Sequence, residues 1–186
     1  MAEIIPILRN LDNFDNQIKI LTDLCKEDLE SINTLIIEKL DSSVPLISKI
    51  ASYLVVSGGK RLRPLLTSAC FNLINNKTDL PLKHIGLAAA VEFIHAATLL
   101  HDDVVDESKK RRGNPTANEV WGNKTSVLVG DFLFSRAFQL MTKFGNLEIL
   151  KILSNTSVII SEAEVLELIN DKNLETNENI YFEVIN

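Results

Sequence analysis

Residues 82–106 read LKHIGLAAAVEFIHAATLLHDDVVD and are predicted to form one long helix. The middle of this segment is apolar on nearly every side of a helix, and a helix of that kind lies at the centre of a bundle, covered by other helices. Apolar residues recur at three- and four-residue intervals almost throughout the rest of the chain, which is the period of the α-helix. The sequence therefore predicts an all-α fold around this segment.

Further helices are expected on both sides of the central segment, because the apolar spacing continues there and glycine or proline marks helix ends. They are predicted at residues 18–25, 35–40, 44–56, 64–73, 116–143 and 147–170, with the start of one more near the end of the chain. The intervening residues 107–115 are predicted to form a charged loop, interrupted by Gly113 and Pro115. No linker or internal repeat stands out, so residues 1–186 are expected to form a single domain.

The charge of the chain restricts its partners. The net charge is −6, and no run of lysine and arginine is long enough to follow a phosphate backbone, so nucleic acid is not expected as a partner. The basic residues gather in two short groups, residues 60–63 and 109–112. Local positive charge in an acidic protein is suited to a small anion.

The expected location of the protein is the cytoplasm. Its N-terminal residues lack the basic and apolar regions of a secretion signal. The most apolar stretch, residues 85–100, contains Glu92 and His95 and is short for a transmembrane helix, so no membrane-spanning segment is predicted. A peripheral contact with a membrane stays open, because an apolar substrate would bring the protein to a membrane surface.

Asp102, Asp103 and Asp106 form an acidic cluster at the end of the predicted central helix. Asp102 and Asp106 are four residues apart, so their carboxylates project from one face one turn apart, with Asp103 beside them. Like charges at this spacing repel each other unless divalent cations lie between them, and Mg²⁺ prefers carboxylate and phosphate oxygens. A solvated helix end is the alternative. The apolar residues directly before the cluster favour a Mg²⁺ site at the mouth of an apolar cavity.

His95 and the two basic groups suggest a second anion site. His95 lies two helical turns before Asp102 on nearly the same face, although a lone histidine on an apolar helix is more often a core residue. Gly59 and the basic residues after it lie at a helix junction, where free backbone N–H groups attract anions. Arg111 and Arg112 follow the acidic cluster, and guanidinium groups are suited to bidentate contacts with diphosphate. These groups together predict one anion held through a metal ion and one held directly by cations.

Three separated motifs resemble the N-terminal half of the trans-isoprenyl diphosphate synthases, in particular the octaprenyl and related long-chain members. They are GGKRLRP (58–64), FIHAATLLHDDVVDESKKRRGNPTAN (93–118) and VLVGDFLFSRAF (127–138). The resemblance implies a helical bundle of the isoprenoid-synthase type around a central apolar cavity. It also implies a Mg²⁺-dependent prenyltransferase that condenses isopentenyl diphosphate with an allylic prenyl diphosphate to extend a long-chain product.

The resemblance implies roles for individual residues as well. Asp102 and Asp106 match the principal Mg²⁺ ligands of the family, with Asp103 in support, and Arg111 falls where the family contacts the allylic diphosphate. These four residues are the expected catalytic residues. The residues that fall where the family binds the diphosphate of isopentenyl diphosphate are Lys60, Arg63, His95 and Arg112.

Two small residues, Ala97 and Thr98, stand five and four places before Asp102. In the family that this sequence resembles, members that make short products often carry bulky aromatic residues at these positions, and the aromatic side chains close the product tunnel. The small side chains therefore imply a product longer than the farnesyl and geranylgeranyl lengths. Replacing Ala97 by phenylalanine is expected to shorten it.

The family's second aspartate-rich motif, and the Lys-Thr motif that precedes it, do not occur in this sequence. We therefore expect a truncated or split synthase, whose partner is a second copy of the chain or a complementary C-terminal half. Two alternatives remain. One is a non-catalytic subunit that binds a diphosphate substrate without turnover. The other is a metal phosphohydrolase, because His101 and Asp102 form an HD dipeptide, with His84 and His95 as the remaining histidines.

Overall fold

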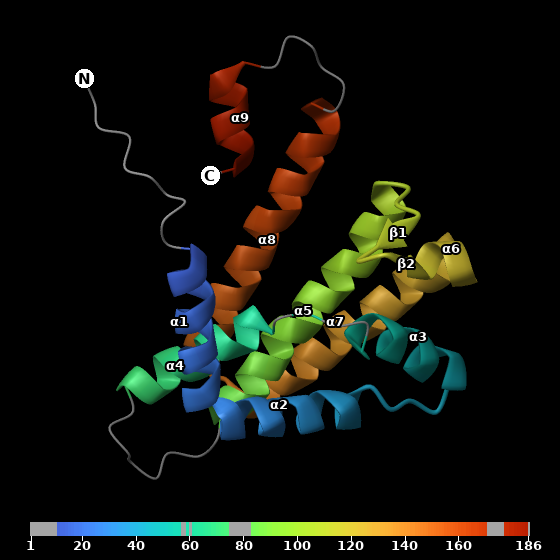
Figure 1. Cartoon of the computed structure of the whole chain (residues 1–186). Helices are drawn as coiled ribbons and strands as arrows, with labels where there is room; N and C mark the ends of the chain where they lie inside the picture. The colour runs from blue at the N-terminus through green and yellow to red at the C-terminus, as the bar shows by residue number, and fades with distance from the viewer. Residues whose placement is uncertain (1–10, 57–58, 60, 75–82, 171–176, 186) are drawn as a thin grey trace, which may run out of the picture. The chain divides into compact units, whose positions relative to one another are not determined.

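A computed structural model describes residues 11–56, 59, 61–74, 83–170 and 177–185 (Figure 1). Within these ranges the chain forms helices and one short antiparallel pair of strands, so the all-α prediction is confirmed. The chain divides into two compact units, Met1–Phe144 and Gly145–Asn186. That they belong to a single domain stays a prediction.

The first unit contains the elements from α1 to α7. In chain order they are α1 (Leu11–Leu24), α2 (Lys26–Lys39), α3 (Pro45–Val56), α4 (Leu62–Ile74), α5 (Lys83–Val105), β1 (Lys110–Arg111), β2 (Asn114–Pro115), α6 (Ala117–Trp121) and α7 (Asn123–Phe144). The second unit contains α8 (Leu147–Asn170) and α9 (Glu178–Ile185). The long helix predicted for residues 82–106 is confirmed as α5.

Helix α5 is the centre of the first unit. It packs most extensively along α7 and makes further contacts with α4 and α2 (Figure 1). Small residues let the helices approach closely: a Cβ atom at Gly86 would overlap the ring of Phe144, and one at Gly130 would overlap the ring of His101. The apolar character of α5 on nearly all sides thus corresponds to its central position.

One face of α5 is only partly covered. Leu87, Val91, Ile94 and Thr98 are half-buried and follow one another at intervals of three or four residues, so they form a single stripe. The stripe continues to Asp102, and we call these five residues the open face of α5. In the described part of the chain, α5 is the helix long and apolar enough to cross a membrane, but most of its apolar window is buried, as in a core helix.

The structure corrects the prediction of one continuous helix at residues 116–143. The helix is broken at Gly122, whose φ of 83° only glycine adopts readily, so the segment forms α6 and α7. The loop predicted at residues 107–115 contains β1 and β2, with Arg111 opposite Asn114. Strands of two residues are too short to give a periodic sequence pattern.

Candidate active site

The three aspartates at the end of α5 have different surroundings. Asp103 is buried, Asp102 is half-buried and Asp106 is exposed. Burial raises the pKa of the Asp102 carboxyl above its ordinary value, and the negative charge of Asp106 raises this pKa further. The predicted repulsion between the two outer carboxylates is therefore present, and a cation bound between them would relieve it.

Helix α5 ends in a Schellman motif directly after the acidic cluster. The N–H of Ser108 donates to the carbonyl of Asp103 at 2.9 Å, and the N–H of Glu107 donates to that of Val104 at 3.3 Å. Glu107 occupies the left-handed position of this motif, with a φ of 52°, where glycine is the usual residue. This turn ends the helix and leads the chain into the β1–β2 hairpin.

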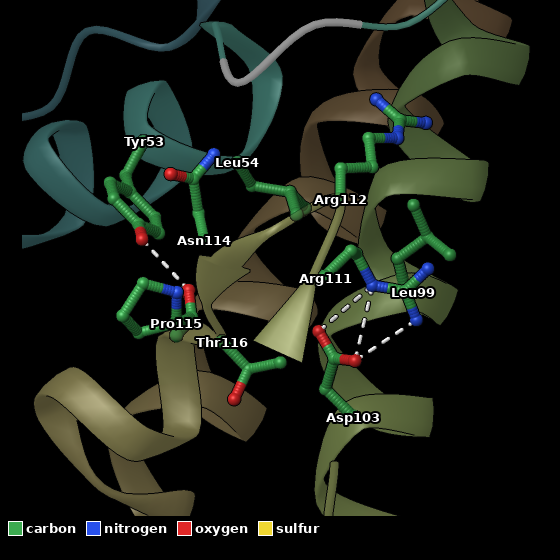
Figure 2. A pocket seen from close by; sticks show the side chains of 10 residues that line it. Tyr53, Leu54, Leu99, Asp103, Arg111, Arg112, Asn114, Pro115 and Thr116 are labelled. Carbon is green, nitrogen blue, oxygen red and sulfur yellow. Dashed lines mark hydrogen bonds and ion pairs between the residues drawn. The ribbon is translucent and has the colours of Figure 1, made fainter. Parts of the chain in front are cut away.

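Asp103 pairs with Arg111, which the hairpin brings back to α5. Arg111 Nε lies 3.1 Å from both carboxylate oxygens, and Arg111 Nη2 lies 2.9 Å from Oδ1 (Figure 2). The Asp103 side chain is 2% exposed and that of Arg111 is 30% exposed. A guanidinium and a carboxylate in this forked geometry form a strong and directional pair. The supporting role of Asp103 in metal binding and the contact of Arg111 with an allylic diphosphate stay predictions.

The hairpin turn consists of Arg112 and Gly113. Both residues have a positive φ, 51° and 84°, as in a type I′ turn. The hydroxyl of Tyr53 on α3 donates to the carbonyl of Pro115 at 2.7 Å and fastens the hairpin to that helix (Figure 2). The base of the hairpin is therefore fixed, and its tip carries Arg112.

Arg112 extends away from the buried ion pair (Figure 2) and reaches the segment before α4. A Cβ atom at Gly59 would lie 3.0 Å from Arg112 Nη1. Burial lowers the pKa of His95, and the positive charges of Arg63 and Arg112 lower it further. We call Arg63, His95 and Arg112 the cation cluster, since both arginines lie near enough to act on His95. Lys60, the fourth predicted ligand of isopentenyl diphosphate, lies outside the described residues.

A small cavity of about 30 Å³ is bordered by α3, α5 and the hairpin (Figure 2). Its size corresponds to roughly one or two water molecules. It is therefore too small for either predicted substrate.

Comparison with known proteins identifies the family. A family model described as polyprenyl synthetase matches residues 44–186. The chain belongs to the polyprenyl synthetase family. It is 44% identical over 165 residues to the octaprenyl diphosphate synthase of Escherichia coli (strain K12), which covers 89% of this chain and 50% of that relative. It is 43% identical over 160 residues to the geranyl-diphosphate-specific all-trans-nonaprenyl-diphosphate synthase of Rhodobacter capsulatus, covering 86% of this chain and 48% of that relative.

Solved structures agree with this assignment. The decaprenyl diphosphate synthase from Rhodobacter capsulatus matches with a TM-score of 0.84 and 52% identity, over 90% of this chain and 51% of that chain. The polyprenyl synthase from Caulobacter crescentus, complexed with calcium and isoprenyl diphosphate, matches with a TM-score of 0.85 and 46% identity, over 90% of this chain and 50% of that chain. The isoprenoid-synthase fold is confirmed, and the chain spans about half the length of the curated relatives it matches.

The site fits Mg²⁺, the metal on which the polyprenyl synthetase family generally depends. Among the described residues, no three His, Cys, Asp or Glu side chains converge as metal ligands. Asp102 and Asp106 nevertheless supply two carboxylates, and Mg²⁺ usually keeps several waters and binds one or two carboxylates together with substrate phosphates. The donor set of this pair is therefore appropriate for Mg²⁺.

Ala97 and Thr98 lie in different environments. Ala97 is completely buried, whereas Thr98 lies on the open face of α5 and its hydroxyl donates to the carbonyl of His95 at 3.0 Å. A phenylalanine at position 97 would have to fit between packed helices. The influence of the two residues on product length stays a prediction.

The surroundings of His101 argue against the phosphohydrolase alternative, as does membership of the polyprenyl synthetase family. His101 Nε2 lies 3.1 Å from the carbonyl of Val127 on α7, and its ring packs against Gly130. No second histidine joins His101 and Asp102 as a metal ligand in the part of the chain that the structure describes. The imidazole instead links α5 to α7.

Sequence reasoning missed the pairing of Arg61 with Glu92. Arg61 Nη1 lies 2.6 Å from Glu92 Oε1, and Arg61 Nη2 donates to the carbonyl of Val55 at 3.0 Å. The sequence did indicate that Glu92 has a partner, because a carboxylate inside the apolar stretch 85–100 requires a cation beside it. Its partner was not readable from the sequence, since 31 positions separate the two residues.

Proposed function

We propose that this polyprenyl synthetase is a prenyltransferase, which condenses isopentenyl diphosphate with an allylic prenyl diphosphate and extends a long-chain trans-polyprenyl diphosphate. The proposal rests on the arrangement along α5, where Asp102 and Asp106 follow His95 by about two and three helical turns, and Arg111 influences the pKa of both Asp102 and His95. Two kinds of anion site side by side suit two diphosphate substrates, one bound through metal and one bound directly. The names of the relatives, which are octaprenyl and nonaprenyl diphosphate synthases, support the same activity.

The allylic diphosphate would occupy the acidic side of the site. Asp102 and Asp106 would hold Mg²⁺, which when bound stabilises the negative charge of the departing diphosphate. Asp103 holds Arg111 in place through their ion pair, and Arg111 would contact the same diphosphate. Breakage of the allylic C–O bond leaves an allylic cation, and the electron pair of the bond departs with the diphosphate.

Isopentenyl diphosphate would bind to the cation cluster, with Lys60 expected to contribute. His95 would gain a proton as the anion binds, because a nearby negative charge favours the imidazolium form. The double bond of isopentenyl diphosphate then attacks the allylic cation and a C–C bond forms. Binding both substrates in one site makes this step effectively unimolecular. The released diphosphate would accept the proton whose loss restores a double bond.

The open face of α5 would guide the growing apolar chain away from Asp102. An apolar wall also excludes water, which would otherwise capture the cation. We further propose that a second chain, a copy of this one or a complementary C-terminal half, covers this face, because the apolar side chains of Leu87, Val91 and Ile94 are only half-buried there. The protein would act in the cytoplasm, with peripheral membrane contact through its product.

The test is incubation of the purified chain with Mg²⁺, an allylic diphosphate and labelled isopentenyl diphosphate, with and without a separately made C-terminal half of a relative. Lengthened prenyl product is expected, and Asp102→Asn should abolish it. Lys124→Gln, a charge change on an exposed residue of α7, is the control and should retain full product formation.

Two results would count against the proposal. Binding of isopentenyl diphosphate without product under either condition would instead establish the non-catalytic subunit. Product formation that is unaffected by Asp102→Asn would separate the activity from the site described above.

A further inference from the structure

Two arginines at the start of α4, Arg61 and Arg63, have different surroundings. Arg63 is exposed and belongs to the cation cluster. Arg61, two residues earlier, has a side chain that is 22% exposed and is paired with Glu92. Charged side chains as buried as these are stable only when paired, so the charge of Arg61 is already compensated within the protein.

Arg61 also connects three helices. Its carbonyl accepts the N–H of Leu65 at 2.9 Å, so it lies at the start of α4. Its guanidinium contacts Val55 near the end of α3 and Glu92 in the middle of α5. Its own φ is 47°, a left-handed conformation that is uncommon for a residue with a side chain and is retained where surrounding contacts enforce it.

Glu92 is an unfavourable neighbour for an anion site. It lies one helical turn before His95, and its negative charge raises the pKa of His95, whereas Arg63 and Arg112 lower that pKa. All of these charges therefore act on the same imidazole. Without a cation beside it, Glu92 would compete with a bound diphosphate for Arg63 and Arg112 and would repel it directly.

We infer that Arg61 is a positioning residue of this site and not a diphosphate ligand: by pairing with Glu92 it neutralises a carboxylate beside the cation cluster and fixes the start of α4, which sets the place of Arg63. This inference rests on the proposed function, because it assumes that the cation cluster binds a diphosphate. Arg63 would bind the diphosphate directly, whereas Arg61 would act on binding through Glu92 and the start of α4.

The test is a double-mutant cycle read by diphosphate affinity. Isothermal titration calorimetry measures the Kd of inorganic diphosphate and of isopentenyl diphosphate for the full chain, for Arg61→Gln, for Glu92→Gln and for the double variant. Arg61→Gln should weaken binding roughly tenfold, because it leaves the Glu92 charge uncompensated. The same change made in the Glu92→Gln background should weaken binding by about threefold or less, because no carboxylate remains to be neutralised.

Two control variants calibrate the cycle. Arg63→Gln should weaken binding whichever residue occupies position 92, since Arg63 would contact the ligand itself. Lys124→Gln removes a charge from an exposed part of α7 and should leave the Kd unchanged. If Arg61→Gln alone does not fold, the double variant is compared with Glu92→Gln, because neither leaves a buried carboxylate without a partner.

The outcomes separate this inference from the proposed function. A direct ligand would lose as much affinity in the Glu92→Gln background as in the original chain, or more, and that result would overturn the positioning role of Arg61. Equal affinity of Arg61→Gln and the unchanged chain would overturn it too. If the unchanged chain binds neither diphosphate compound, the proposed function fails, and the positioning role fails with it.

Discussion

The ion pair between Asp103 and Arg111 predicts that two aspartates of the acidic cluster, Asp103 and Asp106, differ in how much their substitution changes the stability of the protein. Asp103→Asn should destabilise the protein, whereas the same chemical change at Asp106 should not. Asp103 is buried and bonded through both carboxylate oxygens, while Asp106 lies exposed at the same helix end. The two variants therefore differ in the environment of the residue and not in the chemistry of the change.

The magnitude follows from the burial of the pair. Removing one partner of a fully buried ion pair costs about 3–5 kcal/mol. Arg111 keeps some access to water, at 30% exposure, and asparagine retains one oxygen acceptor. The expected loss for Asp103→Asn is therefore about 2–3 kcal/mol. In a protein of this size this loss lowers the Tm by about 4–12 °C.

The assay is urea and thermal unfolding followed by far-ultraviolet circular dichroism. Asp106→Asn should change the free energy of unfolding by less than about 0.5 kcal/mol. Adding Arg111→Gln to Asp103→Asn should cost little more than the single change, because the pair is already broken. Equal unfolding free energies for Asp103→Asn and Asp106→Asn would refute the argument from burial.

Three further predictions concern the backbone and charges of the same region. Glu107→Gly should raise the free energy of unfolding in urea by about 0.5–1 kcal/mol, because glycine adopts the left-handed conformation without steric cost; a loss of stability would contradict this. Asp106→Asn should lower the pKa of Asp102, because it removes a negative charge that raises this pKa. Nuclear magnetic resonance of the Asp102 carboxyl carbon measures the titration, and an unchanged pKa would show that the two carboxylates do not interact. Because the pKa of folded His95 lies below its ordinary value of about 6.5, protonation favours the unfolded state, so the free energy of unfolding should fall as the pH drops below that value. His95→Gln should reduce this fall, and parallel pH curves for the two proteins would argue against it.

The helical architecture was predictable from the sequence because its signals are local. The apolar pattern at residues 82–106 placed α5 within one residue of its observed limits, Lys83–Val105. The break at Gly122 was not predicted, because helical spacing continues on both sides of this glycine and only its backbone angle shows that the helix stops. Periodicity indicates where a helix is favourable and not where the chain changes direction.

The sequence proposed the residues of the candidate site, but not their contacts, and their roles stay predictions. Asp106 raises the pKa of Asp102, and Arg63 and Arg112 lower the pKa of His95, so the interactions within each of these two groups agree with their spacing in the sequence. The burial of Asp103 was not expected, because it depends on a hairpin that returns Arg111 to α5. Pairings of this kind arise from tertiary structure, and spacing along one helix carries no information about them.

The β1–β2 hairpin determines which changes in sequence and length this site tolerates. Arg111 and Arg112 are adjacent in sequence, yet one reaches inward to Asp103 and the other outward to the backbone at Gly59. Arg111 ends β1, whereas Arg112 begins the turn with a positive φ, so the change of backbone conformation between the two residues directs their guanidinium groups to different targets. With the hairpin register held, inserting one residue directly before Lys110 would move Arg111 to the turn and place Lys110 opposite Asp103. The hairpin should therefore accept replacement of its surface lysines far more readily than a change in its length.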